Sequence, residues 1–175
     1  RAAIVSSCWV SFDSDGKLTT DFGATDVTYA IALSANDLSL FVAGDSQYSS
    51  NYDFAIAKYN AGDGTLDSGF DSDGKLTEDV GSSDDRVYAI TSSADGNSLF
   101  VAGSSGGNFA IAKYNASNGT LDTNFDGDSL TGNGKITTDF LGTDTAYAIT
   151  LSADGNSLFV AGYSGGNFAI AKYSA

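Results

Sequence analysis

The sequence predicts an all-β protein made of three tandem four-stranded antiparallel units. The stretch from Ser93 to Tyr114 returns almost unchanged as Ser152 to Tyr173, and a looser copy runs from Ser34 to Tyr59. Within each copy, short runs rich in β-branched and aromatic residues alternate with turn residues such as Asp-Gly and Gly-Gly. An internal repeat of this kind indicates one supersecondary module used three times.

The first strand expected in each copy follows an FDSDG-type turn. Its apolar residues are flanked by lysine and threonine, which predicts a half-solvated outer strand. The three versions of this strand span residues 16–22, 74–80 and 134–140.

The other three strands of each copy contain the runs YAI, LFVAG and FAIAKY. In the first FAIAKY run, Phe54 and Ile56 share one face, whereas Ala55 and Ala57 share the opposite face. Both faces are therefore apolar, one bulky and one small, which favours sheets stacked face to face. The blades of a β-propeller pack in this way. A threefold β-prism of four-stranded sheets is the alternative.

The repeats divide the chain into four parts. Residues 1–10 precede the first repeat and form a candidate extra strand, and the repeats span residues 11–67, 68–122 and 123–175. The first repeat differs at its second hairpin, where we expect the Gly-Gly turn to expand into a longer loop over residues 45–53.

Charge and composition exclude several classes of function. Acidic residues outnumber basic ones 22 to 8, and the net charge of −14 opposes binding to nucleic acid or an anionic membrane. The chain has no histidine, which removes the usual triads and metal ligands, and we expect no enzymatic activity. No apolar run reaches the roughly 20 residues of a membrane span, so we expect no membrane insertion.

The start of the chain predicts processing. It begins at Arg1 without an initiator methionine, as expected of a processed or excised product from which any signal peptide has been removed. Cys8 is the only cysteine, so it is either a free buried thiol or half of an intermolecular disulfide. We expect a secreted or cell-surface protein.

Three sequence segments, read in succession, carry a family resemblance. FDSDGKLTTDFG, YAITLSADGNSLFVAG and NFAIAKYNASNGTLD resemble the delta-60 repeats of bacterial secreted and surface proteins, and the resemblance covers Ser11 to Ala175. It implies a propeller-like β repeat in an exported protein, and it supplies no catalytic residues. The cationic residue usual before the tyrosine of this repeat is present as Lys58, Lys113 and Lys172.

Three blades are too few to close a propeller, which needs roughly four to eight. An open row would expose an apolar face at each end and unpaired strand edges. We therefore expect self-association, either as a six-bladed ring of two chains or as a head-to-tail filament. A threefold prism formed by the three repeats of one chain is the alternative. The N-terminal strand either joins the sheet edge of a neighbouring subunit or completes a blade of its own chain. Its residues Ala2, Ala3, Ile4, Val5 and Trp9 are the candidate contacts.

The expected function is that of an extracellular structural or adhesive protein, such as part of a filament or surface fibre. The alternative is a carbohydrate-binding module on the same scaffold, in which Tyr48 and Tyr52 of the inserted loop stack on a sugar. Packing of these tyrosines against an adjacent blade is the other interpretation.

Two further kinds of site are suggested by short motifs. Alternating aspartates before glycine resemble calcium loops without their full spacing, and turn formation also explains them; the candidates are Asp13, Asp15, Asp71, Asp73, Asp126 and Asp128. We expect no other cofactor. Asn115 and Asn118 begin overlapping N-glycosylation patterns in an expected exposed turn.

Overall fold

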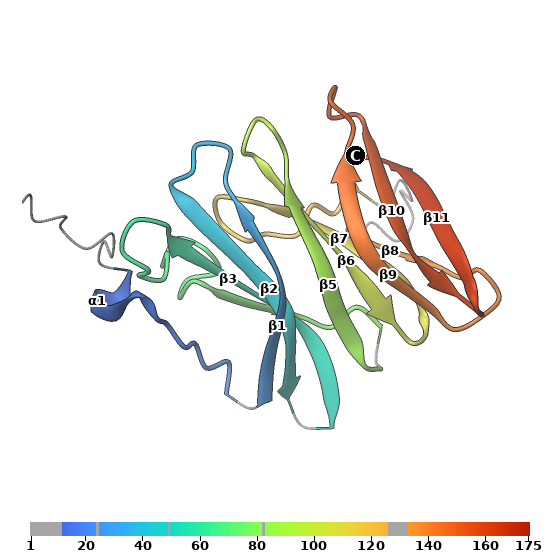
Figure 1. Cartoon of the computed structure of the whole chain (residues 1–175), viewed down its shortest axis with the longest axis horizontal. Coiled ribbons are helices and arrows are strands. Elements are labelled where there is room, and N and C mark those ends of the chain that lie inside the picture. Colours follow the sequence, from blue (N-terminus) through green and yellow to red (C-terminus); the bar gives the residue numbers. More distant parts are fainter. Residues whose placement is uncertain (1–11, 24, 49, 82, 126–132) are drawn as a thin grey trace, which may run out of the picture.

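The computed structural model describes residues 12–23, 25–48, 50–81, 83–125 and 133–175. It contains three antiparallel sheets that stand in a row (Figure 1). A single helical turn, α1 (Asp13–Gly16), precedes the first sheet. The first sheet has the order β1-β2-β3-β4, formed by β1 (Thr25–Leu33), β2 (Ser39–Tyr48), β3 (Asn51–Asn60) and β4 (Lys75–Glu78).

The second and third sheets repeat this arrangement. The second has the order β5-β6-β7-β8, formed by β5 (Asp85–Ser92), β6 (Ser98–Ser105), β7 (Asn108–Asn115) and β8 (Lys135–Thr138). The third contains three strands, β9 (Asp144–Leu151), β10 (Ser157–Ser164) and β11 (Asn167–Ser174), with β10 in the centre. The prediction of an all-β chain of antiparallel, blade-like units is confirmed.

The fourth strand of each sheet comes from the following sequence repeat. β4 pairs with β3, with Ile56 opposite Leu76, and β8 pairs with β7, with Ile111 opposite Ile136. The sheets are therefore offset by one strand from the sequence repeats. The strand predicted over residues 16–22 is wrong, because the chain there forms no ladder within the described residues. Its counterparts become strands only by pairing with a preceding sheet.

The insertion in the first repeat lengthens two strands instead of forming the predicted loop. β2 continues to Tyr48 and β3 starts at Asn51, and these two residues pair with each other. These strands have 10 residues each, against 8 in β6 and β7. The hairpin therefore projects two residue pairs beyond its counterparts.

The hydrophobic core lies in two layers between the sheets. Phe54 and Ile56 of the first sheet share one core cluster with Val101, Ala110 and Ala112 of the second. The second layer repeats the pattern between the second and third sheets, with Phe109, Ile111, Ala146, Val160 and Ala169. Bulky faces thus pack on small faces, as the sequence predicts, and the sheets form a row, not a threefold prism (Figure 1).

A β-bulge interrupts the innermost strand of each sheet. The register skips Tyr29, Tyr88 and Tyr147, which lie at equivalent positions. A bulged residue is left unpaired and its side chain is redirected. Here the three rings form a ladder across the sheets, with ring centroids 5.1 Å and 5.4 Å apart. Among the described residues, no helix is long and apolar enough to cross a membrane.

Candidate functional site

The outer face of the third sheet exposes residues that are buried in the other two sheets. Phe168 is 98% exposed and Ile170 is 70% exposed, whereas their counterparts Phe54, Ile56, Phe109 and Ile111 are all at 0%. Phe159 and Tyr163 of β10 are exposed on the same face. We call these four residues the bulky end face. Its residues resemble those on the bulky faces of the first and second sheets, which are covered by the second and third sheets, respectively.

The edge of the third sheet is open where the other sheets are closed. β4 and β8 hydrogen-bond to β3 and β7, but β11 has only β10 as a partner within the described residues. An open edge presents a row of unpaired N–H and C=O groups that another strand can join. The bulky end face and this free edge lie on the same strand, β11.

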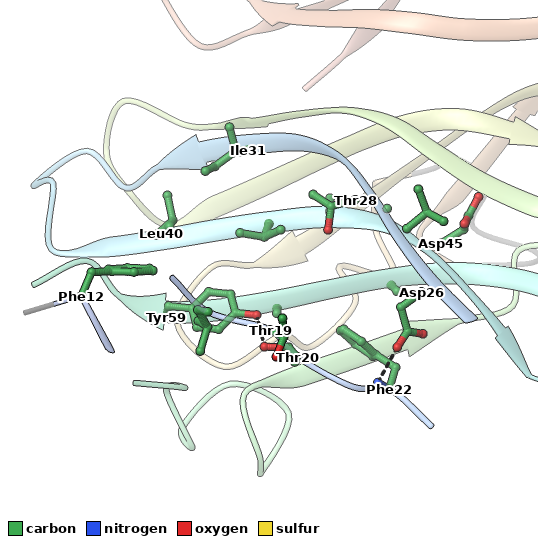
Figure 2. A pocket seen from close by; sticks show the side chains of 17 residues that line it. Phe12, Thr19, Thr20, Phe22, Asp26, Thr28, Ile31, Leu40, Asp45 and Tyr59 are labelled. Carbon is green, nitrogen blue, oxygen red and sulfur yellow. Dashed lines mark hydrogen bonds between the residues drawn. The ribbon is translucent and has the colours of Figure 1, made fainter. Parts of the chain in front are cut away.

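The outer face of the first sheet is the opposite end of the row, and it presents small residues. We define the small end face by Leu40, Val42, Ala55 and Ala57. These residues line a cavity of about 400 Å3, and Leu18 and Phe22 of the preceding segment also line it. Figure 2 shows Leu40 and Phe22 in this lining. The counterparts of this face in the second sheet, Leu99, Val101, Ala110 and Ala112, are packed against the bulky face of the first sheet instead.

The segment Lys17–Phe22 contacts the first sheet in the same way as β8 and the loop after it contact the third sheet. The Tyr59 hydroxyl donates to Thr20 Oγ1 at 2.6 Å, and Tyr173 and Thr138 make the equivalent contact at 2.8 Å. Lys75 Nζ donates to the Asp21 carbonyl oxygen, and Lys135 Nζ donates to that of Asp79.

The loop after this segment is also built like its counterparts. The backbone N–H of Phe22 donates to Asp26 Oδ2 at 2.8 Å (Figure 2), and Val80 and Phe140 donate in the same way to Asp85 and Asp144. Residues 17–20 therefore lie where a fourth strand would lie, and they pair with no sheet among the described residues.

Tyr52 takes part in the junction between the first two sheets. The Arg86 guanidinium lies 4.0 Å from the centre of its ring, and Arg86 Nη1 donates to Asp45 Oδ2 at 3.2 Å. Asp45 is almost wholly buried; this burial raises the pKa of its carboxyl group, against the lowering effect of Arg86. One face of the Tyr52 ring is thus covered by Arg86. The side chain of Tyr48 lies outside the described part.

The aspartates predicted as calcium ligands form turns where the structure describes them. Asp15 Oδ1 accepts the backbone N–H of Lys17, and Asp73 Oδ1 accepts that of Lys75. Asp71 adopts a positive φ of 44° in the same turn. The structure brings none of these three into a group of three acidic side chains within the described residues. The side chain of Asp13, and Asp126 and Asp128, lie outside the described part.

Asn115 and Asn118 lie in an exposed turn, as the sequence predicts. Their side-chain oxygens accept hydrogen bonds from Ser117 and Thr120, respectively. Glycosylation there stays a prediction. Cys8 and the residues of the candidate N-terminal strand, Ala2, Ala3, Ile4, Val5 and Trp9, lie outside the described residues.

A group of acidic side chains that the sequence did not suggest lies at the junction of the first two sheets. Carboxylate oxygens of Asp53, Asp79 and Asp85 lie within 4.8 Å of one another. Asp53 is on β3, Asp79 directly follows β4, and Asp85 begins β5. The recurrence of an aspartate at the positions of Asp26, Asp85 and Asp144 is the sequence signal that could have indicated it.

Comparison with known families agrees with the sheet architecture. Residues 39–70 and 94–125 match the family described as "Domain of unknown function (DUF5122) beta-propeller". The chain is a β-propeller-like repeat protein. The delta-60 family stays a resemblance beyond this broader assignment.

No curated protein sequence matches the chain. A solved structure entitled "Crystal structure of the eukaryotic initiation factor" is similar over 90% of this chain, with 10% identity and a TM-score of 0.48. The similarity covers 35% of that structure's chain, so this chain spans about a third of its length.

Proposed function

We propose that this propeller-like chain is an extracellular, non-enzymatic structural protein whose copies join head to tail. The bulky end face of one copy covers the small end face of the next. The observation that carries the proposal is the exposure of Phe168 and Ile170, whose counterparts are buried between sheets. Covering two such side chains contributes about 1.5–3 kcal/mol each. The resemblance to delta-60 repeats supports the extracellular location.

The two end faces complement each other in shape and chemistry. Inside the chain, Phe54 and Ile56 share a core with Val101, Ala110 and Ala112. The corresponding residues of the small end face are Val42, Ala55 and Ala57, and they line the cavity described above. Phe168 and Ile170 of a second copy therefore have a matching surface, beside which Leu18 and Phe22 lie in the described part of the chain.

Pairing between strands of the two copies sets their relative orientation. Ile56 lies opposite Leu76, and Ala57 lies opposite Lys75. By the same register, Leu18 of one copy pairs with Ile170 of the other, and Lys17 pairs with Ala171. The third sheet thereby gains its fourth strand, and the segment Lys17–Thr20 gains its ladder.

The contact joins two different surfaces, so it is heterologous and repeats from copy to copy. It closes if two copies complete a six-bladed ring and grows into a filament if they do not. Because neither arrangement requires chemistry, the proposed role is mechanical or adhesive. Electron microscopy of the purified chain distinguishes the ring from the filament.

A mixed cross-linking experiment tests the register. Leu18→Cys and Ile170→Cys are made separately in a Cys8→Ser background, with tags of different mass, then mixed and oxidised. Paired residues across antiparallel strands have β-carbons about 4.5–5.5 Å apart, close enough for a disulfide after small adjustments. We expect a mixed disulfide dimer in high yield.

The matched control replaces Leu18→Cys by Thr123→Cys, which places an exposed cysteine in the turn after β7, beside residues of the second sheet and away from the small end face. We expect it to give only the low yield of random collision. Equal yields of mixed dimer from both mixtures would contradict the proposed register.

A further inference from the structure

The acidic group at the junction of the first two sheets combines an exposed, a half-buried and a buried side chain. Asp79 is exposed, Asp53 is partly buried, and Asp85 has an exposed fraction of 0%. The group therefore extends from the surface into the protein. An ion from solvent has access to it through Asp79.

The buried member of the group has an unused acceptor. Asp85 Oδ2 accepts the backbone N–H groups of Val80 at 2.5 Å and Gly81 at 3.2 Å. Its other oxygen, Oδ1, is buried and makes no hydrogen bond of normal geometry with the described residues, although the Ser105 hydroxyl lowers the pKa of this carboxyl group. A buried carboxylate oxygen without a donor is costly unless a cation or a proton satisfies it.

The acidic side chains around the group increase this cost. Burial, followed by repulsion from Asp79, Asp85 and Glu78, raises the pKa of Asp53. Burial also raises the pKa of Asp85. The nearby Lys135 Nζ binds Glu78 Oε1 and the Asp79 carbonyl oxygen, each at 2.7 Å. Asp84 Oδ1, on the adjoining loop, accepts the backbone N–H of Tyr52.

We propose that Asp53, Asp79 and Asp85 bind a divalent cation, calcium, that joins the first sheet to the second. Three carboxylates supply the hard oxygen ligands that calcium prefers. Oxygens on opposite sides of a calcium ion are about 4.6–5.2 Å apart, twice its metal–oxygen distance. The three carboxylate oxygens, which lie within 4.8 Å of one another, meet this limit without rearrangement.

The junction between the second and third sheets provides an internal comparison. Asn108, Asp139 and Asp144 occupy the positions of Asp53, Asp79 and Asp85. Asp144 Oδ2 likewise accepts a backbone N–H, and its Oδ1 is buried without a partner in the described part of the chain. Replacement of one carboxylate by an amide lowers the charge by one, so this junction binds calcium more weakly.

Calorimetric titration of the chelator-treated full chain with calcium chloride tests the proposal, together with thermal unfolding. We expect saturable binding with a dissociation constant of about 0.1–1 mM, the range of extracellular calcium modules. Asp53→Asn reproduces the residue at the second junction, and we expect it to weaken binding by about tenfold, equivalent to about 1.4 kcal/mol. Asp53→Asn with Asp79→Asn should abolish binding.

The control is Asp37→Asn, which removes one negative charge from an exposed turn. Asp37 has a φ of 58°, a conformation that asparagine also adopts readily, so the fold is unaffected. We expect calcium affinity equal to that of the unmodified chain. The absence of both binding heat and a rise in Tm at about 10 mM calcium would overturn the proposal. So would equal affinity in the double variant, which would move binding to other aspartates.

Discussion

Gly103 lies so close to Arg86 on the neighbouring strand that a β-carbon at residue 103 would sit 1.7 Å from the Arg86 carbonyl oxygen. Gly44 and Gly162 make the same approach to Val27 and Thr145, at 1.9 Å in both cases. All three glycines lie opposite the bulged part of the innermost strand. The bulge, and the tyrosine ladder that it produces, therefore requires glycine at this position.

Gly103→Ala should be strongly destabilising, because the backbone of β5 has to move to admit the methyl group. We expect the free energy of unfolding to fall by about 3 kcal/mol or more, measured by urea denaturation. Gly107→Ala is the control, since its φ of 82° is unfavourable for alanine but open space surrounds it. We expect Gly107→Ala to lower the free energy of unfolding by about 1–2 kcal/mol. Equal losses would show that steric contact at Gly103 is unimportant.

Arg86→Thr should leave Asp45 buried without its cation. Breaking such a pair costs about 3 kcal/mol, because the remaining carboxylate stays desolvated. The pKa of Asp45, already raised by burial, should rise further. An acid whose folded-state pKa is raised above its unfolded value loses stability as the pH rises through that pKa. We therefore expect the deficit of Arg86→Thr to shrink as the pH falls towards 4.

The double variant Asp45→Ser with Arg86→Thr tests the cause of this loss. It reproduces Ser104 and Thr145, which occupy the same positions at the next junction. With the buried charge removed, most of the lost stability should return, in a double-mutant cycle measured by urea denaturation. Additive losses in the double variant would mean that Asp45 and Arg86 act independently.

Asp95 should titrate well below an ordinary aspartate. Its carboxylate accepts hydrogen bonds from the Ser93 hydroxyl and from the backbone and side chain of Asn97, which lower its pKa to about 2. Stability from this group is therefore present above about pH 4 and is lost as the pH falls through 2. Ser93→Ala should return the pKa towards 3.8 in a carboxyl NMR titration, while Asp154, which has its own serine partner, stays near 2. A pKa near 3.8 in the unmodified chain would contradict this account.

The sheet architecture could be predicted because the residue pattern of each strand shows which kind of surface it packs against. Alternation of Phe54 and Ile56 with Ala55 and Ala57 gives two apolar faces of different size, which is only useful between two stacked sheets. The bulges were not visible, since Tyr29 follows the same alternation as an ordinary strand residue. The register of the paired strands reveals them, as does the close approach of Gly44 to the opposite strand.

The pairing of the fourth strand could not be predicted from the repeat. A tandem repeat marks its period but not its starting point, so Lys75–Glu78 looks equally suited to the sheet before it and the sheet after it. The acidic group was hidden for a similar reason. Asp53 is distant in sequence from Asp79 and Asp85, and only the stacking of two sheets brings it to them.

In the proposed assembly, the bulky end face of one copy is covered by another copy. Light scattering over a range of micromolar concentrations tests it most directly, with the unmodified chain compared with Phe168→Asp. Phe168 is 98% exposed, so the substitution leaves each sheet intact. We predict assemblies that grow with concentration for the unmodified chain and a monomer with the same thermal unfolding for Phe168→Asp. The account would be contradicted if the unmodified chain stayed monomeric at every concentration. It would also be contradicted if Phe168→Asp left assembly unchanged.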